Sequence, residues 1–416
     1  MPNFEPNRQA AHARLAAVLP DDYARTRNAL DGAVTRLSPY LTHGFLSLPE
    51  VFAAVHARHP LHAQHKFVFE LGWRAYFRHV WAYQGDGIHQ SLHPGLLPDD
   101  AYQYEMPVDV LEARTGIPAI DLAVRELYAT GYVHNHARMW LASYLVHLRK
   151  VHWHTGGQWM LGHLLDGDVA SNYLSWQWVA GTGSSKPYLF NAGNVAKFAP
   201  SDWHSPGTVL DTSYETMDRL ARDTRPIINK QPALHAGSGL DEPARRVTPP
   251  PHTKWLPPDS AAVSGRDVWL LHPWSLGAAQ DRLPVDAVRI GVGFDACHAA
   301  TPWSERRWNF VTQGLRTQTE SLWWGSVEHM ALALQTARSV QWQSDPHVDA
   351  ALEQLRGQLS GAGLMSVAPY RPLCLFDPVN VYCRSFSDWW KRTQINRAPT
   401  PEIFERPLTE NQLRCR

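Results

Sequence analysis

Charged side chains share a helical face with aromatic ones in the first half of this sequence, a combination that packed cores seldom use. Glu70 and Arg74 lie one helical turn apart and Trp73 lies beside them, so the three side chains share one face of a helix. This arrangement favours a polar ligand resting against an apolar wall. The alternative is an ordinary salt bridge between Glu70 and Arg74 on a helix surface.

A second face of this kind runs through the segment 134–139, His-Asn-His-Ala-Arg-Met. Asn135, Arg138 and Met139 recur at the spacing of one helical turn and combine an amide, a guanidinium and a thioether. Core helices rarely mix these groups, so the pattern indicates a ligand-facing surface. The alternative is that Asn135 caps the helix while Arg138 is solvated.

Further along the sequence, two carboxylates and two tryptophans form another group of candidate residues. One residue separates Asp166 from Asp168, and one residue separates Trp176 from Trp178. Histidine or a third carboxylate is missing at ligand spacing nearby, so we predict no metal site. The glycine-rich stretch 181–186 is a weak candidate for a phosphate loop because no apolar strand precedes it.

A candidate phosphate-binding site is the predicted helix start at Ser38-Pro39. Serine is a natural N-cap, and proline at the first helical position loses no hydrogen bond. The free backbone amides of a helix start suit a diphosphate. The alternative is a cap with no ligand.

The composition limits the partners and the setting. With 416 residues the chain has room for two or three domains, and 18 tryptophans exceed what packing usually requires. The formal net charge is zero, so a nucleic acid has to be held by a local basic patch. The four cysteines are widely spaced, which argues against a disulfide framework and favours a reduced, cytoplasmic setting. We expect neither a membrane span nor a signal peptide.

Residues 1–200, which contain all of these candidate residues, are predicted to form helices joined by short loops. Ser47 and Glu50 have capping-box spacing and open a helix that runs to about His59. Two apolar stripes at helical spacing predict further helices, one through Ile120, Val124 and Leu127, the other through Leu141, Leu145 and Leu148. Proline-rich residues 201–265 predict a linker with one short helix at 214–222.

Short apolar runs alternate with helical stretches over residues 266–395, which predicts an α/β domain with a parallel sheet. Residues 396–416 are expected to form a C-terminal tail. The expected strands are 268–271, 288–292, 322–324, 340–342 and 373–376, and the expected helices are 304–315, 327–337, 348–359 and 387–391.

Taken in order, the motifs of residues 20–200 resemble the FAD domain of the DNA photolyase/cryptochrome family. The matching segments are Thr-Arg-Leu-Ser-Pro-Tyr-Leu (35–41), Glu-Leu-x-Trp-Arg (70–74), Arg-Thr-Gly-Ile-Pro (114–118), His-Asn-x-x-Arg-Met (134–139), Asp-Gly-Asp (166–168) and Trp-Gln-Trp (176–178). The resemblance implies a helical domain that binds FAD.

The resemblance also implies roles for individual residues. Trp153 and Trp176 match the middle and proximal members of an electron-transfer chain, and either Tyr102 or Tyr104 stands where the distal tryptophan is expected. Asn135 is implied both at the cofactor and in the wall of a DNA-damage cavity. The other implied cofactor residues are Tyr23, Thr35, Leu37, Ser38, Arg74, Arg138, Asp166, Asp168 and Asn172, and the other implied cavity residues are Glu70, Trp73, Met139 and Trp178.

The implied activity is light-driven repair of cyclobutane pyrimidine dimers in damaged DNA by an electron from reduced FAD. Two phosphate contacts are weakened, because His136 replaces a basic residue and the arginine expected after Tyr188 is missing. This departure supports a second hypothesis, a cryptochrome-like blue-light sensor without repair activity. A third is a structural flavoprotein whose α/β domain binds something else. The oligomeric state and any antenna pigment are not predicted.

The α/β domain stands in an unusual place, because members of this family carry it before the FAD domain. Residues 267–271 resemble the family's first strand, and 386–392 resemble the segment that closes that domain. We therefore expect a circular permutation, which is physically easy where domain termini lie on the surface. The alternative is an unrelated α/β module.

Overall fold

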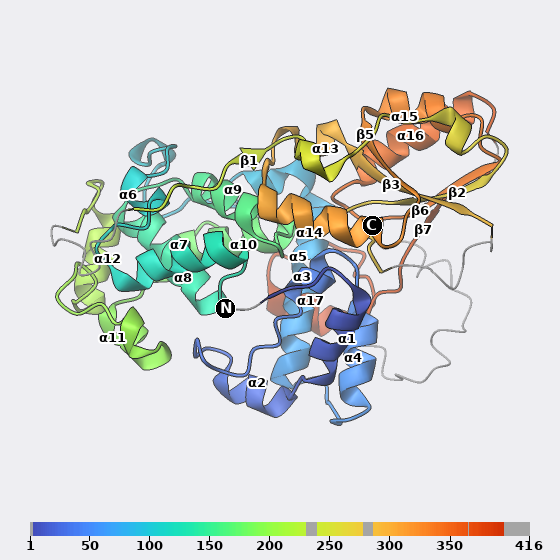
Figure 1. The fold of residues 1–416 in the computed structure, drawn as a ribbon. Coiled ribbons are helices and arrows are strands. Elements are labelled where there is room, and N and C mark those ends of the chain that lie inside the picture. The colour runs from blue at the N-terminus through green and yellow to red at the C-terminus, as the bar shows by residue number, and fades with distance from the viewer. Residues whose placement is uncertain (1–2, 230–238, 278–285, 365, 395–416) are drawn as a thin grey trace. The chain divides into compact units, whose positions relative to one another are not determined.

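The computed structural model describes residues 3–229, 239–277, 286–364 and 366–394. The chain forms two compact units, which are described separately below (Figure 1). We call residues 19–34 and 65–244 the helical unit. We call residues 4–18, 35–64 and 245–416 the α/β unit. The expected domain boundaries at residues 200 and 265 stay predictions, and the expected tail 396–416 lies outside the described residues.

The helical unit is built on a buried apolar core to which the predicted stripes contribute. Ile120, Val124 and Leu141 have no exposed surface, and Leu127 has 1%. Its elements are α2 (Pro20–Thr26), α5 (Lys66–Gln84), η1 (Gly85–His89), η2 (Asp99–Ala101), α6 (Val108–Leu111), α7 (Pro118–Thr130), α8 (Asn135–Ser143), η3 (Tyr144–Leu148), α9 (Trp153–His163), α10 (Val169–Ala180), α11 (Ala192–Phe198), η4 (Ser201–Trp203) and α12 (Tyr214–Arg222). The short helix predicted at 214–222 is confirmed as α12.

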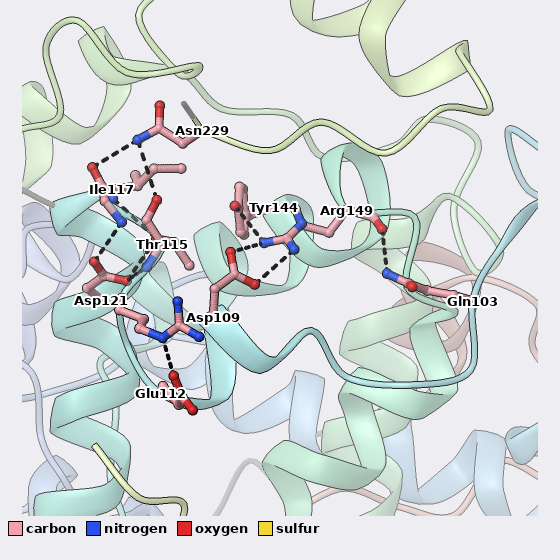
Figure 2. A network of polar contacts seen from close by, with 11 residues as sticks. Gln103, Asp109, Glu112, Thr115, Ile117, Asp121, Tyr144, Arg149 and Asn229 are labelled. Atoms are coloured by element: carbon pink, nitrogen blue, oxygen red, sulfur yellow. Dashed lines mark hydrogen bonds and ion pairs between the residues drawn. The ribbon is translucent and has the colours of Figure 1, made fainter. Parts of the chain in front are cut away.

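Element η3 is a π-helical turn that continues α8, and a buried polar network surrounds it. Figure 2 shows Arg149 between Asp109 and Tyr144. The guanidinium donates to both carboxylate oxygens of Asp109, at 2.7 and 2.9 Å, and to the Tyr144 hydroxyl at 3.2 Å. A bidentate pair of this kind fixes orientation as well as charge. The network therefore holds α6 against the end of η3.

The motif segment 114–118 is a turn clasped by a carboxylate from α7. Asp121 accepts hydrogen bonds from the Thr115 amide and hydroxyl, both at 2.8 Å, and from the Gly116 amide at 3.1 Å. The same turn receives a bond from the Asn229 side chain at the Gly116 carbonyl, 3.2 Å away (Figure 2). This motif therefore has a structural role in the helical unit.

Lys150 fastens α12 to the same region. Its ammonium donates to the carbonyls of His147, Leu220 and Ala221 at 2.7, 2.9 and 3.0 Å, and the residue is 2% exposed. The last carbonyls of a helix lack partners within the helix, so this cation satisfies two of them at the end of α12. The first part of the proline-rich stretch is thus ordered against the helices.

The α/β unit contains a five-stranded sheet with all neighbouring strands parallel, as predicted. The strand order is β5-β3-β2-β6-β7, so the first strand is central. The strands are β2 (Asp267–Leu271), β3 (Val288–Phe294), β5 (Ser321–Gly325), β6 (Ser339–Gln343) and β7 (Val367–Tyr370), and the connecting helices are α13 (Asp295–Ala299), α14 (Glu305–Arg316), α15 (Val327–Leu334) and α16 (Asp349–Gly361), with α17 (Phe386–Arg392) after the last strand.

Four of the five predicted strands are confirmed. The fifth was expected at 373–376, but the structure places it at β7, Val367–Tyr370. Strand β7 includes Pro369, which has no amide proton to donate. Proline in the interior of a segment disfavours a strand there, so the sequence did not predict one at 367–370. Pro369 is tolerated because β7 is at the edge of the sheet.

Residues that precede the sheet in the sequence, and a short strand within it, also belong to this unit. They form α1 (Arg8–Ala16), α3 (Ser38–Thr42), α4 (Leu48–His56), the two short paired strands β1 (Arg245–Arg246) and β4 (Trp303–Ser304), and the turns η5 (Pro251–Thr253) and η6 (Ser260–Ala262). The Ser47–Glu50 capping box is confirmed at the start of α4. Tyr40 packs against Phe45 and Phe310 of α14, at ring centroid distances of 5.9 and 6.4 Å. The helices at 35–64 thus pack onto the α/β unit.

The sheet edge at β5 is covered by the end of the proline-rich stretch. The Leu256 amide donates to the Leu322 carbonyl at 2.8 Å, and the Trp324 amide donates to the Leu256 carbonyl at 2.9 Å. Unpaired edge strands promote association with other chains, so this segment protects one edge of the sheet.

Two features bear on the setting of the chain. The described residues contain no helix long and apolar enough to cross a bilayer. Cys297 and Cys383 carry thiols that are not part of a disulfide.

Candidate functional site

The carboxylate of Asp168 is the meeting point of two arginines in the helical unit. It is the N-cap of α10, accepting a bond from the Ser171 amide at 2.8 Å. Arg78 of α5 donates to its Oδ2 at 2.6 Å, and Arg74 lies 3.5 Å from the same oxygen. The Asp168 side chain has no exposed surface. A buried carboxylate is tolerated because these charged partners surround it.

Arg138, which is partly buried, forms an ion pair with the buried Asp166. The guanidinium donates to both carboxylate oxygens at 3.0 and 2.8 Å, and its Nε donates to the Val133 carbonyl at 2.8 Å. The Tyr132 ring lies 5.3 Å from the guanidinium carbon. Burial alone would lower the pKa of Arg138, but the adjacent Asp166 raises it. The alternative of a solvated Arg138 is therefore wrong.

Glu70 pairs with cations other than the one considered in the sequence. Lys66, one turn earlier in α5, lies 2.8 Å from Glu70 Oε1, and Arg27 lies 3.4 Å from it. The alternative of a Glu70–Arg74 salt bridge is replaced by these pairs. Tyr23 lies in the same cluster, where burial and then Glu70 raise the pKa of its hydroxyl, and its ring meets Phe67 edge-on at 5.7 Å.

The face formed by Asn135 and Met139 is open to solvent at Asn135. The Asn135 amide approaches the Met139 sulfur at 3.7 Å. His134 is the residue that caps α8, by accepting a bond from the His136 amide at 3.1 Å, so the alternative of capping by Asn135 is wrong. Trp178, in the last turn of α10, is also exposed, at 39%.

Asn172 and Trp176 lie on buried turns of α10. The Asn172 amide donates to the Gly157 carbonyl at 2.9 Å. A methyl group at Gly156 would come within 2.5 Å of the Trp176 ring, so a glycine is required for α9 to approach this tryptophan. Ser171, between Asp168 and Asn172, has a buried hydroxyl without a hydrogen-bond partner in the protein.

An aromatic series leads from this region to the surface. Trp153 lies 6.2 Å from Tyr173 and 5.5 Å from His152 between ring centroids. His152 stacks on Tyr104 at 4.9 Å with an interplanar angle of 21°, whereas Tyr102 meets it edge-on at 6.1 Å. Tyr104 is 61% exposed. Of the two tyrosines considered in the sequence, Tyr104 has the closer contact and the greater access to water.

Three expected residues lie in the other unit. Thr35, Leu37 and Ser38 precede or begin α3 in the α/β unit. The helix starts at Ser38 with Leu37 as its N-cap residue, one position earlier than predicted, which is within the usual uncertainty of helix ends. The assignment of these three residues to a cofactor stays a prediction.

Residues that sequence reasoning missed include Arg78, Lys66 and Arg27. Arg78 follows Arg74 by one helical turn, so the same periodicity that singled out Glu70 and Arg74 extends to it. Arg27 carried no local signal, because its partner Glu70 is distant in the sequence. Among the described residues, no group of three or more histidines, cysteines and carboxylates is placed to hold a metal ion.

Residues 67–203 match the family model described as the FAD binding domain of DNA photolyase. The helical unit therefore contains an FAD-binding domain of the kind found in DNA photolyases. A five-stranded parallel sheet follows this domain in the sequence, which is consistent with a permuted arrangement of the two domains of photolyases and cryptochromes.

Individual relatives carry two kinds of name. The chain is 37% identical over 39% of its length to a deoxyribodipyrimidine photo-lyase from Streptomyces griseus and 35% identical over 54% to one from Thermus thermophilus. It is 35% identical over 39% to a cryptochrome DASH from Gloeobacter violaceus. It spans 36%, 58% and 34% of these relatives, respectively. An archaeal photolyase structure from Sulfolobus tokodaii, with two FAD molecules, is 30% identical, with a TM-score of 0.40 over 46% of this chain and 44% of that one.

The residues of the helical unit fit an FAD molecule by their chemistry. Arginine side chains are the usual partners of a diphosphate. Arg74 and Arg78 lie close together, because both contact Oδ2 of the buried Asp168 carboxylate. The buried hydroxyl of Ser171 has no hydrogen-bond partner in the protein, and Ser171 lies in the first turn of α10, between Asp168 and Asn172 in the sequence. Buried hydroxyls normally have partners, so this group suits contact with a polar ring edge.

Proposed function

We propose that this chain is a light-driven repair enzyme for cyclobutane pyrimidine dimers in DNA. The observation that carries the proposal is that the implied cofactor residues of the helical unit are buried, whereas two of the implied substrate residues are exposed. Asp166, Asp168, Asn172 and Trp176 are buried, at 7%, 1%, 8% and 3% exposure, while Asn135 and Trp178 are exposed. Buried polar groups suit a resident cofactor, and exposed aromatic and amide groups suit a substrate that comes and goes.

The cofactor residues in this proposal act by binding and orientation. Arg138 and Asp166 hold one another in place, Asp168 and Asn172 offer polar atoms to the ring edge, and Arg74 binds on the diphosphate side. Reduced FAD, when bound, supplies an electron under blue light. The protein's part is to keep this region dry and ordered, which strengthens each polar contact.

The substrate residues act on the damaged bases. A dimer has to leave the duplex to reach a buried cofactor, and Trp178 and Trp73 stack against the extruded bases. Lys66 and Arg27 orient Glu70 through ion pairs, so that its carboxylate accepts a hydrogen bond from a pyrimidine N–H. Asn135 and Met139 complete the wall.

The proposal is tested by repair of an oligonucleotide that contains one thymine dimer, with fully reduced protein under blue light and in the dark. We expect the dimer to be lost only in the light. Trp178→Ala should weaken binding of the damaged strand by about 1–3 kcal/mol, because one stacking platform is removed. Tyr83→Ala, which removes an exposed ring of α5 outside the wall, is the matched control. An intact dimer after illumination of reduced protein contradicts the proposal.

A second candidate is a blue-light sensor that does not repair DNA. It is favoured by the similarity to a cryptochrome DASH and by the two phosphate contacts that the resemblance implies to be weakened, because weaker phosphate contacts lower DNA affinity through reduced counterion release. Photoreduction of bound FAD without dimer repair and without damage-specific DNA binding at moderate salt supports the sensor.

We also propose that electrons enter along Trp176, Trp153 and Tyr104. Trp153→Phe should remove most of the photoreduction of bound FAD by an external reductant, because the middle ring is lost. Tyr104→Phe should slow it, since an exposed phenol can release its proton to water on oxidation. Tyr102→Phe is the control, and its hydroxyl is bonded to the Leu97 backbone. If Tyr102→Phe slows photoreduction more than Tyr104→Phe, the assignment of the exit is wrong.

A further inference from the structure

One face of the Trp178 indole is backed by Tyr188. The two rings stack with a centroid distance of 5.7 Å and an interplanar angle of 29°. Trp178 is 39% exposed, and Tyr188 is half-buried. Since Tyr188 covers one face of the indole, a flat ligand has the opposite face available for stacking.

The glycine-rich stretch after α10 explains how Tyr188 reaches this position. Gly181 ends the helix in the left-handed region, at φ +78°, and donates to the Gln177 carbonyl. A methyl group there would lie 3.3 Å from the Pro187 nitrogen. The chain then turns back, and the Tyr188 amide donates to the Val179 carbonyl at 3.0 Å. The stretch that sequence reasoning weighed as a weak phosphate loop is therefore a return turn.

His136 and Ser143 of α8 fix Tyr188 from behind. The Tyr188 hydroxyl lies 3.1 Å from His136 Nε2, and His136 Nδ1 lies 2.7 Å from the Asn28 carbonyl. A carbonyl only accepts, so Nδ1 carries the proton and the neutral imidazole accepts the Tyr188 proton at Nε2. His136 is 7% exposed, and burial lowers the pKa of its imidazole. The Ser143 hydroxyl donates to the Tyr188 carbonyl at 2.8 Å.

We propose that Tyr188, held by His136, is a positioning residue that fixes the Trp178 ring and so raises the preference of the protein for dimer-containing over undamaged DNA. The part of this inference that concerns DNA rests on the proposed function; the part that concerns the ring does not. A fixed indole loses less side-chain freedom on binding than a mobile one, and this lowers the cost of stacking.

The ring is tested first, without DNA. In protein labelled with 5-fluorotryptophan, the Trp178 fluorine resonance is identified by its absence in Trp178→Phe. We expect Tyr188→Leu to shift and narrow this resonance, and Tyr188→Phe to shift it less, because the ring remains while its hydroxyl anchor is lost. Tyr83→Leu, which changes an exposed tyrosine of α5, should leave it in place. An unchanged Trp178 resonance in Tyr188→Leu overturns the inference.

DNA preference is tested next, with holoprotein and single-stranded oligonucleotides that carry one dimer or none. Tyr188→Leu should weaken binding of the dimer strand about 3- to 10-fold, the effect of one aromatic pair. Binding of the undamaged strand and repair at saturating substrate should stay near the parental values. Equal weakening for both strands overturns the assigned preference.

Folding and function are kept apart in these experiments. If Tyr188→Leu fails to fold, as judged from bound FAD and thermal unfolding, Tyr188→Phe and His136→Gln take its place, each expected to shift the Trp178 resonance. A parental protein that repairs no dimers overturns the proposed function, while the fluorine experiment still decides whether Tyr188 positions Trp178. A parental protein that repairs dimers, with Tyr188→Leu indistinguishable from it, overturns only the positioning role.

Discussion

Replacing Arg138 with leucine should lower the free energy of unfolding of the protein by about 3–5 kcal/mol, because the change leaves a buried carboxylate without its partner. Asp166 is 3% exposed at its side chain and accepts two bonds from Arg138. Leucine also cannot donate to the Val133 carbonyl, which accepts from the Arg138 Nε. We expect the variant to lose bound FAD as well, since the pair belongs to the proposed cofactor residues.

The measurement is urea unfolding followed by circular dichroism, together with the ratio of FAD to protein after purification. The matched control is Arg222→Leu, which breaks another arginine–aspartate pair, with Asp218, at 55% and 46% side-chain exposure. Exposed pairs contribute about 0–1 kcal/mol, so this control should stay near the parental stability and keep its FAD. Equal losses in the two variants would mean that burial of the Arg138–Asp166 pair has no special energetic role.

Acidification should destabilise the helical unit through His147. This residue is 1% exposed, and its Nε2 lies 2.9 Å from the Val179 carbonyl. Burial lowers the pKa of His147 from 6.5 to about 4. As the pH falls from 6.5 toward 4, the unfolded chain binds a proton that the folded chain refuses. Stability contributed by the neutral imidazole is therefore present above pH 6.5 and lost progressively below it, by about 3 kcal/mol in full.

The variant His147→Leu isolates this effect. It removes the titrating group, while the Val179 carbonyl keeps the bond from the Tyr188 amide. Above pH 7 the difference in unfolding free energy between parental and variant protein should be constant. Below that, the parental protein should lose up to about 3 kcal/mol more than the variant by pH 4. Parallel curves over this range would show that His147 does not resist protonation in the folded state.

Most elements of both units follow from periodicity in the sequence. The capping box at Ser47, the apolar stripes of α7 and α8, and four strands of the sheet have local signals, and each is present in the structure. The strand at Val367–Tyr370 was missed, because its edge position, not its sequence, makes Pro369 acceptable. The FAD-binding domain is likewise indicated by motifs whose order can be read directly in the sequence.

The ion pairs between charged residues, by contrast, could not be predicted from helical periodicity. A helical repeat places Glu70, Arg74 and Arg78 on one face, but it does not say which carboxylate each arginine meets. Folding brings Arg74 and Arg78 to Asp168 and leaves Glu70 to Lys66 and Arg27. Spacing of one turn sets neighbours within a helix, whereas long-range pairs depend on how helices pack.

The sequence by itself indicated an FAD-binding domain, because its motifs, which include Arg138, Asp166 and Trp176, resemble those of the photolyase/cryptochrome family in type and order. Only the tertiary structure decided that Arg138 pairs with a buried Asp166, that Tyr188 backs Trp178, and that Thr35 lies in the α/β unit. The physical reason is the range of the interactions. Hydrogen bonding along a helix is local, but burial and ring stacking depend on segments that meet only when the chain has folded.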